Sequence, residues 1–596
     1  MIYRHDIQFL RGIAVLLVVL FHLRVPGFAN GYLGVDIFFV ISGFLMASIY
    51  SGGDWKAFLL RRAKRLLPAY FAVVGVTLLV GVLYLDFGAL KDLGEQITWA
   101  TLFVSNLGYW TQNSYFAKDD FNPLLHLWSL GVEIQFYLFV PVLFAVWRRF
   151  PFLLYVTLIV SLISCLVLVG ISPKTAFFML PFRVWEFSIG CIAASMIAER
   201  KWISRKRVDF FWFFSVFSIL LLVFQGDLNG ESLEILSGHP AAIAFAITIL
   251  TGTALFVGGK QKINPPLSRA MGWLGDHSYS IYLVHFPIIV LFFYQPFSGT
   301  RIPEPQVFDL FILLVGIVFS AWVLRRFVER NNEKLFSAWR CVFAIFVINL
   351  AVPTALLVKE HTYSKYELNV RNSIFDRAEY RCGKLFRVLH PTWKVCKLNS
   401  VVSSNRALLV GNSHADSIKI SFSKVATDKN FEAWFVVQNQ PLMNSPGALK
   451  TRDILEEVEV RGITHVVLHY DSGGIDTSVL DDLLPSLKVN GVSVDFIAPV
   501  PVWNDSVPRM VLQSIAASEE VDSQSYDEYV QKNLDWFQYF KSDMAGDARL
   551  LNSGSVFCDP VCKFGDDNGK LYYFDQGHLT LTGAMLLEPL IKLALE

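Results

Sequence analysis

Long apolar segments recur along the first three-fifths of the chain. A segment of about 17–25 apolar residues is long enough to cross a bilayer as a helix. Eleven segments meet this length, with ends defined to within a few residues: 7–24, 32–50, 67–86, 128–147, 152–170, 176–197, 209–225, 239–258, 278–295, 307–324 and 340–358. The pattern predicts a polytopic α-helical membrane region of eleven spans.

The polar loops between these segments differ in charge. Lysine and arginine cluster in the loops after the second, fourth, sixth, eighth and tenth predicted spans, and they are sparse in the alternate loops. Loops rich in lysine and arginine stay in the cytoplasm. The N-terminus is therefore predicted to be cytoplasmic, and an odd number of spans places the C-terminal region outside.

The hydrophobic pattern changes after the last predicted span. Polar, helix-like stretches there alternate with short apolar runs: Ala407–Val410, Phe431–Val437, His465–His469 and Val492–Ile497. Strands that alternate with helices are typical of α/β layers with a parallel sheet. We expect a membrane domain over 1–335, the eleventh helix and a linker over 336–365, and a soluble three-layer α/β domain over 366–596.

Composition supports the membrane assignment and narrows the partners. Hydrophobic residues make up 54% of the chain and charged residues 17%, against about 25% charged in ordinary soluble domains. Mean hydropathy is +0.44. The net charge of +1 gives no reason to expect nucleic acid as a partner. The apolar segments lead us to expect a lipid bilayer as the surroundings. Neither a zinc-type Cys/His spacing nor a P-loop is present, so we expect no metal and no bound cofactor.

Cysteine usage fits an extracytoplasmic C-terminal region. Four of the seven cysteines lie there, and disulfides form in oxidising compartments. These four are Cys382, Cys396, Cys558 and Cys562. Four cysteines allow three pairings. The pairing between sequence neighbours, Cys382 with Cys396 and Cys558 with Cys562, is the one we favour, and buried free thiols are the alternative.

A serine stands at the end of the first apolar run of this region. In "LLVGNSHADS", Gly411 allows a tight turn and Ser413 lies where a helix would begin. The free N–H groups of a helix N-terminus can stabilise an oxyanion. A serine needs a base to become a nucleophile. Asp575 and His578, three residues apart in "FDQGHLTLTG", suit an orienting acid and a base, while His414 is a rival base.

Together these two stretches resemble the SGNH (GDSL-like) esterases and acyltransferases, over about 400–596. The resemblance implies Ser413 as nucleophile, His578 as base and Asp575 as orienting acid. Asn412 replaces the family's usual Asp, and the family's central Gly and Asn blocks have no clear match. Besides Ser413 itself, the candidates for the oxyanion hole are Asn444, Gly447 and the turn "HYDSGG" at 469–474.

The predicted spans carry polar residues, which are costly inside a membrane and by default functional. Arg11 and His22 are eleven residues apart in the first span, on one helix face and roughly 16 Å apart along its axis. Ser129, Glu133 and Tyr137 share one face of the fourth span, and topology brings Asp36, Ser129 and Glu133 toward the depth of His22. The alternative is an arginine that snorkels to the surface and a histidine at headgroup level.

Further arginines follow these positions. Arg183 and Glu186, three residues apart in the sixth span, suit an internal ion pair. Arg61, Arg62 and Arg65 stand together in a predicted cytoplasmic loop. Such a cluster is explained by the charge bias of cytoplasmic loops alone, or it serves as a clamp for the phosphates of a nucleotide-bearing donor.

Six stretches resemble the acyltransferase-3 family in family order over about 5–335: "LRGIAVLLVVLFH", "GYLGVDIFFVISGFL", "RRAKRLLPAYF", "LWSLGVEIQFYL", "FRVWEFSIG" and "GDHSYSIYLVHFPI". The resemblance implies ten spans and transfer of an acyl group, usually acetyl, from cytoplasmic acetyl-CoA as co-substrate. Arg11 and His22 correspond to the family's essential pair. Glu133 is a further catalytic candidate, and the candidates for donor binding are Arg11, Arg61, Arg62, Arg65 and Arg183.

The combination resembles fused acyltransferase-3/SGNH proteins that O-acetylate bacterial surface glycans such as lipopolysaccharide O-antigen. We therefore expect a multi-pass protein of the bacterial inner membrane whose periplasmic domain meets a glycan acceptor. Alternatives are another envelope glycan (peptidoglycan or an exopolysaccharide), an outer domain that acts as an esterase, or a transporter with a periplasmic binding domain. A transporter would not explain why Ser413, Asp575 and His578 occur together.

Overall fold

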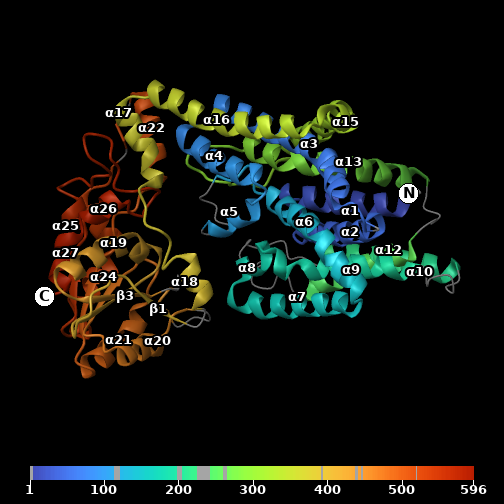
Figure 1. Cartoon of the computed structure of the whole chain (residues 1–596). Helices are drawn as coiled ribbons and strands as arrows, with labels where there is room; N and C mark the ends of the chain where they lie inside the picture. Colours follow the sequence, from blue (N-terminus) through green and yellow to red (C-terminus); the bar gives the residue numbers. More distant parts are fainter. Residues whose placement is uncertain are drawn as a thin grey trace. The chain divides into compact units, whose positions relative to one another are not determined.

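A computed structural model describes residues 4–50, 52–112, 121–197, 205–224, 242–258, 265–390, 393–436, 441–443, 448–518, 520–521 and 523–596. The chain divides into two compact units, Met1–Leu357 and Val358–Glu596 (Figure 1). The first unit is helical, and the second contains the sheet.

Helices make up the described part of the first unit, together with short 3-10 turns. They are α1 (His5–His22), α2 (Gly34–Ile49), α3 (Trp55–Tyr84), α4 (Phe87–Thr101), α5 (Ser105–Thr111), α6 (Leu127–Arg149), α7 (Phe152–Ile171), α8 (Pro173–Phe178), α9 (Val184–Ser195), α10 (Arg205–Phe224), α12 (Ala242–Val257), α13 (Pro265–Phe292), α14 (Val307–Phe327), α15 (Asn332–Leu335) and α16 (Ala338–Thr362). Each of the eleven predicted spans overlaps one of these helices.

Eight helices of the described residues are long and apolar enough to cross a membrane. The predicted spans 176–197 and 239–258 correspond to the shorter apolar helices α9 and α12, and 278–295 falls in the second half of α13. The multi-pass helical character is therefore confirmed, while the number of crossings remains a prediction.

The apolar helices differ in how much of their surface the protein covers. The apolar windows of α1 and α2 are 61% and 67% buried, whereas those of α7 and α16 are 17% and 6% buried. A helix that is apolar but uncovered by protein is suited to contact with lipid. Asp6 of α1 and Asp36 and Ser42 of α2 are buried among these helices, so the inner helices can enclose polar groups.

Small residues allow these inner helices to approach closely. A Cβ atom on Gly43 of α2 would lie 2.0 Å from the carbonyl oxygen of Phe187 in α9, and one on Gly190 of α9 would lie 2.0 Å from that of Val40. Only glycine fits at such a crossing, which is how membrane helices often pack. The same holds between α1 and α13, where Gly275 faces the carbonyl oxygen of Gln8. The α1–α13 contact brings the helix of Arg11 and His22 against the helix of His285.

The second unit is built on a six-stranded sheet in the order β1-β3-β2-β4-β5-β6. Its strands are β1 (Val395–Lys397), β2 (Arg406–Val410), β3 (Glu432–Val436), β4 (His465–His469), β5 (Ser493–Ile497) and β6 (Arg549–Leu551). Strand β1 pairs antiparallel with β3, and every other neighbouring pair in the sheet is parallel. The predicted parallel sheet is thus present with one antiparallel edge strand, and the four apolar runs correspond to β2–β5.

Helices cover both faces of this sheet (Figure 1). The helices of this unit are α17 (Lys365–Asn372), α18 (Lys384–Leu389), α19 (Ser413–Asp428), α20 (Thr451–Arg461), α21 (Thr477–Val489), α22 (Val507–Ala517), α23 (Tyr526–Lys532), α24 (Leu534–Tyr539), α25 (Gly554–Phe557), α26 (Leu581–Met585) and α27 (Glu588–Ala594). Along β2, Ala407 and Leu409 join the core with α19, and Leu408 and Val410 join the other with α21. This alternation is expected of a strand buried on both faces.

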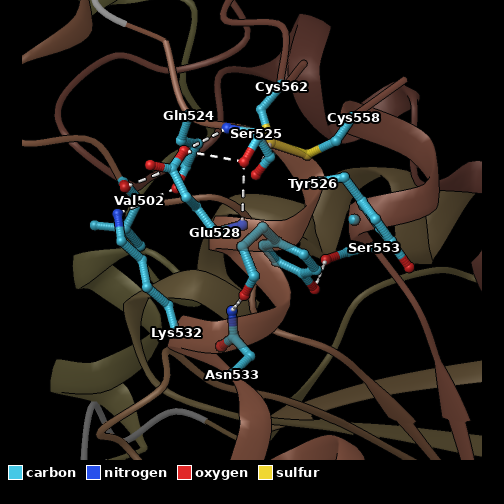
Figure 2. The surroundings of a disulfide bond; sticks show 12 residues. Val502, Gln524, Ser525, Tyr526, Glu528, Lys532, Asn533, Ser553, Cys558 and Cys562 are labelled. Carbon is cyan, nitrogen blue, oxygen red and sulfur yellow. Dashed lines mark hydrogen bonds between the residues drawn. A yellow bond between two sulfur atoms is a disulfide. The ribbon is translucent and has the colours of Figure 1, made fainter. Parts of the chain in front are cut away.

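The described cysteines of the second unit form two disulfides, Cys382–Cys396 and Cys558–Cys562. This is the pairing between sequence neighbours that the sequence favoured. Figure 2 shows the second bridge beside the start of α23, where Cys562 N–H donates to the Gln524 carbonyl (2.9 Å). The Gln524 side chain in turn donates to the Val502 carbonyl (3.3 Å). The bridge is thereby linked to the loop 502–507.

Candidate active sites

The nucleophile candidate lies at the junction of β2 and α19. Ser413 is the first residue of α19, and Asn412 caps this helix by accepting a hydrogen bond from His414 N–H (3.1 Å). A Cβ atom at Gly411 would lie 1.9 Å from the carbonyl oxygen of His469. Glycine is therefore required for the turn to pass β4, and the turn brings Ser413 to the carboxyl edge of the sheet, where α/β proteins hold their ligands.

Ser413, His578 and Asp575 form a continuous hydrogen-bonded series. His578 Nε2 lies 2.7 Å from Ser413 Oγ, and His578 Nδ1 lies 2.6 Å from Asp575 Oδ2. Asp575 Oδ1 also accepts from the backbone N–H groups of Gly577 (2.9 Å) and His578 (2.7 Å). Burial alone would raise the pKa of Asp575, but these hydrogen bonds outweigh it and hold the pKa below its usual value. The carboxylate therefore stays ionised and fixes the proton of His578 on Nδ1.

A neighbouring loop holds the backbone of the Asp575–His578 turn. Trp503 N–H donates to the Gln576 carbonyl (2.8 Å), and Val507 N–H donates to the Asp575 carbonyl (3.2 Å). The same loop is bonded through Val502 to Gln524 beside the second disulfide (Figure 2). The base is thus positioned by a rigid support and does not depend on its own turn alone.

His414 is placed differently from a base for Ser413. Its ring lies 4.6 Å from that of His578, between centroids, and the side chain is buried with no hydrogen-bond partner at Nδ1. Burial, followed by the proximity of His578 and His469, holds the pKa of His414 well below its ordinary value. His414 is therefore a neutral ring that packs against His578, and the geometry favours His578 as the base.

The sequence-based candidates for the oxyanion hole include Ser413, at the N-terminus of α19, and the turn 469–474. Asn444 and Gly447 lie outside the described residues. In the turn 469–474, Asp471 Oδ1 accepts a hydrogen bond from Asn412 Nδ2 (2.6 Å). A carboxylate cannot donate to an oxyanion, so Asp471 orients Asn412 beside the nucleophile. The N-terminus of α19 remains the clearest source of donors for an oxyanion.

A cavity lies inside the helical unit, between α1, α2, α3, α6 and α13. Its polar lining consists of Arg11, Ser42, Arg62, Arg65, Ser129, Glu133, Tyr137, Ser278, Tyr279 and Tyr282. Glu133 accepts hydrogen bonds from the hydroxyl groups of Ser42 and Tyr137. The cavity therefore brings Glu133 together with Arg11, Arg62 and Arg65, and the depth of Glu133 relative to His22 stays a prediction.

His22, at the end of α1, is not among the residues that line this cavity. Its Nδ1 atom lies 3.2 Å from Nε2 of His285 in α13. His126 lies beside His285, with ring centroids 5.4 Å apart. Sequence reasoning missed both His126 and His285. His285 lies inside the quoted stretch "GDHSYSIYLVHFPI", but only the packing of α13 on α1 shows which histidine it meets.

Two arginines lie apart from the predicted donor site. Arg183 is fully buried and contacts Asp36 Oδ1 (3.3 Å) and Glu186 Oε1 (3.2 Å). The predicted ion pair with Glu186 is thus present, but Arg183 does not line the cavity, because two buried carboxylates offer its charge better compensation. Arg61 is exposed and also outside the cavity lining. Asp36, expected near His22, belongs to the Arg183 cluster.

Side chains of the types that bind metal ions occur in both units of the part of the chain that the structure describes. None of its groups of histidine, cysteine, aspartate or glutamate side chains is arranged to hold a metal ion. The chemistry available is that of a Ser-His-Asp site in one unit and of an arginine-lined cavity with a nearby histidine cluster in the other. This pair of sites defines an acyl-transfer protein with a membrane part and an SGNH-type part.

Comparison with known proteins agrees with this class. The family model described as an acyltransferase domain (acyltransferase-3) matches residues 4–361, more than half of the chain, and the model described as an SGNH domain fused to AT3 domains matches residues 381–593. The chain belongs to the acyltransferase-3 family and carries the SGNH domain found fused to such domains.

Curated relatives include the O-acetyltransferase OatA of Staphylococcus aureus strain MRSA252, which is 32% identical over 399 residues. The same protein name and identity hold for strain NCTC 8325. Each alignment covers 60% of this chain and 64% of the relative, so the chain spans less than two thirds of their length. Among solved structures, the periplasmic domain of a lipopolysaccharide acetyltransferase from Salmonella ser. Paratyphi A matches with 13% identity and a TM-score of 0.28, covering 38% of this chain and 94% of that one.

Proposed function

We propose that this protein is an O-acetyltransferase that moves acetyl groups from cytoplasmic acetyl-CoA to a hydroxyl group of an envelope glycan outside the inner membrane. The observation that carries the proposal is the Ser413–His578–Asp575 geometry within an SGNH domain that is fused to an acyltransferase domain. An esterase would need the same three side chains, but fusion to an acyltransferase domain favours transfer over hydrolysis.

The outer site has the groups for a two-step transfer. His578 Nε2 takes the proton of Ser413 as Oγ attacks the acyl carbonyl carbon, and the N-terminus of α19 stabilises the oxyanion. The leaving group departs with the proton from His578, and Ser413 keeps the acetyl group as an ester. A sugar hydroxyl then attacks this ester, gives its proton to His578, and regenerates Ser413 when that proton returns.

The membrane cavity has the groups for a donor that carries phosphates. Arg11, Arg62 and Arg65 converge on it, and guanidinium groups bind phosphate oxygens in a bidentate manner. Half-buried Arg62 and exposed Arg65 would meet the donor first, and Arg11 would meet it deeper. In this proposal, acetyl-CoA is a co-substrate and His22 is the base of the membrane step.

The acceptor is a glycan hydroxyl. Lipopolysaccharide O-antigen is our first candidate, from the family resemblance, and peptidoglycan and exopolysaccharide are the alternatives. Mass spectrometry of each glycan fraction, from hosts with and without the gene, tests the proposal. O-acetyl groups should be lost from one fraction in the deletion strain and return with wild-type protein but not with Ser413→Ala. An esterase would give the reverse, with more acetyl groups in the deletion strain.

The proposed function requires that the two ends of the chain lie on opposite sides of the membrane. A cytoplasmic N-terminus and a periplasmic C-terminus follow from the charge bias of the loops. A reporter enzyme that works only in the periplasm should be active when fused after Glu596 and silent when fused after residue 335. The opposite pattern would remove the periplasmic glycan as the acceptor.

A further inference from the structure

Three histidines from distant parts of the chain gather at the end of α1. His22 ends this helix, His126 immediately precedes α6, and His285 lies within α13. The ring centroid of His285 is 5.1 Å from that of His22 and 5.4 Å from that of His126. Among the described residues, His285 is the one whose ring nitrogen is recorded in contact with a His22 nitrogen, at 3.2 Å. This contact shows which nitrogens carry protons, because each imidazole nitrogen either donates a hydrogen bond or accepts one.

The proton of His285 is assigned by its other contact. His285 Nδ1 lies 2.7 Å from the carbonyl oxygen of Tyr282, one turn earlier in α13. A carbonyl oxygen only accepts, so Nδ1 must carry the proton. The His285 side chain is fully buried, and burial disfavours a charged imidazolium. In the neutral ring, Nε2 therefore has a lone pair and acts as an acceptor.

The proton of His22 follows from this acceptor. A contact of 3.2 Å between His285 Nε2 and His22 Nδ1 is a hydrogen bond only when His22 Nδ1 donates. The His22 ring also bonds to the backbone carbonyl of Val18, one turn earlier in α1; because a neutral ring has one N–H, the same Nδ1–H serves both acceptors. A neutral His22 then has no proton on Nε2. The contact with His285 thus leaves the lone pair of His22 on the nitrogen that points away from His285, where it can act as a base.

The histidines lie next to the cavity wall. Ser129 and Tyr282 line the cavity, and the hydroxyl groups of both donate to the backbone carbonyl of His126, at 3.2 Å and 3.0 Å. The Tyr282 ring centroid is also 5.5 Å from that of His285. Residues of the wall are therefore in contact with both histidines that accompany His22.

We propose that His285 is a positioning residue that holds His22 in its Nδ1–H tautomer and keeps His22 Nε2 free to accept a proton during the membrane acyl transfer. This inference rests on the proposed function. As an acceptor hydroxyl oxygen bonds to the acetyl carbon of acetyl-CoA, its proton passes to His22 Nε2. The carbon–sulfur bond breaks, and the proton then passes to the departing CoA sulfur, so both histidines end neutral.

Two substitutions of His285 separate hydrogen-bond acceptance from packing. His285→Leu fills the space but cannot accept from His22. His285→Gln offers an amide oxygen to His22 Nδ1–H and an amide N–H to the Tyr282 carbonyl. We expect His285→Leu to lower kcat for acetyl-CoA-dependent transfer by about 10–100-fold, the usual cost of removing the group that orients a functional histidine. KM for acetyl-CoA should stay unchanged, and His285→Gln should retain most of kcat.

His277 provides the matched control. It lies on the same helix, and its Nδ1 also bonds to a backbone carbonyl, that of Trp273 (2.8 Å). His277→Leu should leave kcat unchanged in the full-length protein in lipid vesicles. The proposal is overturned when His285→Gln is as inactive as His285→Leu, or when His277→Leu and His285→Leu lose activity alike.

A spectroscopic measurement covers the case in which His285→Leu does not fold. Solid-state nitrogen NMR of the full-length protein, labelled at histidine nitrogens and compared with His22→Ala, reports which His22 nitrogen carries the proton. We expect protonated Nδ1 and unprotonated Nε2, and the reverse tautomer overturns the proposal. Failure of the proposed function looks different: wild-type protein would not use acetyl-CoA, or His22→Ala would keep the full rate, whatever the tautomer.

Discussion

Each unit contains a candidate site built around a histidine, and the two histidines obtain their orientation differently. In the outer unit, His578 is oriented by Asp575, three residues away in the same turn. In the helical unit, the partner of His22 is His285, 263 residues away. A short motif therefore carries most of the outer site, whereas the membrane site exists only when α13 packs on α1.

The two units also differ in how exposed their charged and titratable side chains are. The side chains of His578 and Asp575 are 28% and 32% exposed, so a large acceptor can reach them. In the helical unit, Arg183, Asp36 and Glu186 are almost completely buried and occur as a cluster, because an unpaired charge in a membrane is very costly. The outer pair is thus open to solvent, whereas the buried cluster compensates its own charges.

The largest expected effect is the loss of ester hydrolysis at the outer site when its nucleophile or its base is removed. The full-length protein should hydrolyse a small activated acetyl ester slowly, because an activated leaving group bypasses the membrane donor. Ser413→Ala should lower this rate by about 10⁴-fold or more, and His578→Ala should do nearly the same. Because the residues act as a unit, the double variant should be little worse than either single variant.

His414→Ala is the matched control for this series. His414 packs against His578 but makes no hydrogen bond to Ser413 among those recorded for the described residues, so the ester rate should fall far less. A Ser413→Ala protein with its full ester rate would remove the acyl-enzyme step. A His414→Ala protein as inactive as His578→Ala would mean that the bases are wrongly assigned.

His22→Ala tests whether the two sites act in series. Loss of the membrane base should lower acetyl-CoA-dependent glycan acetylation by about 10²–10⁴-fold. Hydrolysis of the activated ester by the outer site should be unaffected, since that substrate does not need the membrane unit. Both rates are measured on the same preparation. Normal glycan acetylation by His22→Ala would exclude the proposed role of the membrane unit.

A smaller effect is expected from the pair Asn412 and Asp471. Asn412→Asp places two carboxylates at hydrogen-bond distance, and Asp471→Asn replaces the charged acceptor with a neutral amide oxygen, which weakens the hydrogen bond from Asn412. The exchange of both, Asn412→Asp with Asp471→Asn, keeps one donor and one acceptor. Contacting residues typically couple by about 0.5–3 kcal/mol, so each single variant should lose ester activity and the double variant should recover much of it. Additive losses would show that the contact does not matter.

The smallest effect concerns stability of the outer unit in acid. Burial lowers the pKa of His469 to about 4. The unfolded chain therefore binds a proton as pH falls below about 6.5 while the folded unit does not, so folding stability decreases toward acid. From this residue alone the loss between pH 7 and pH 5 is about 2 kcal/mol.

His469→Asn keeps a donor for the Ile497 carbonyl, which His469 Nδ1 meets at 3.0 Å, but it does not titrate. Urea unfolding of a 358–596 fragment at both pH values measures the effect. The pH dependence should be weaker in His469→Asn by about 2 kcal/mol. Equal pH dependence in the two proteins would contradict a neutral buried His469.

Local pattern was sufficient for much of the architecture. The apolar segments predicted where helices lie because a bilayer accepts only long apolar helices, and the four runs of the second unit correspond to β2–β5. The short edge strands β1 and β6 were missed because three residues carry too little periodicity. The antiparallel direction of β1 depends on its pairing with β3, which no local signal reports.

The sequence by itself determined the two-part organisation and the candidate triad, since Asp575 and His578 are local to one turn and Ser413 follows a strand and a glycine. Only the tertiary structure decided that His578 and not His414 meets Ser413, that Arg183 also contacts Asp36, and that His285 meets His22. Each of these contacts joins segments far apart in the chain. The packing of whole helices and loops determines their geometry. Such packing produces no residue pattern of fixed spacing that could be recognised in the sequence.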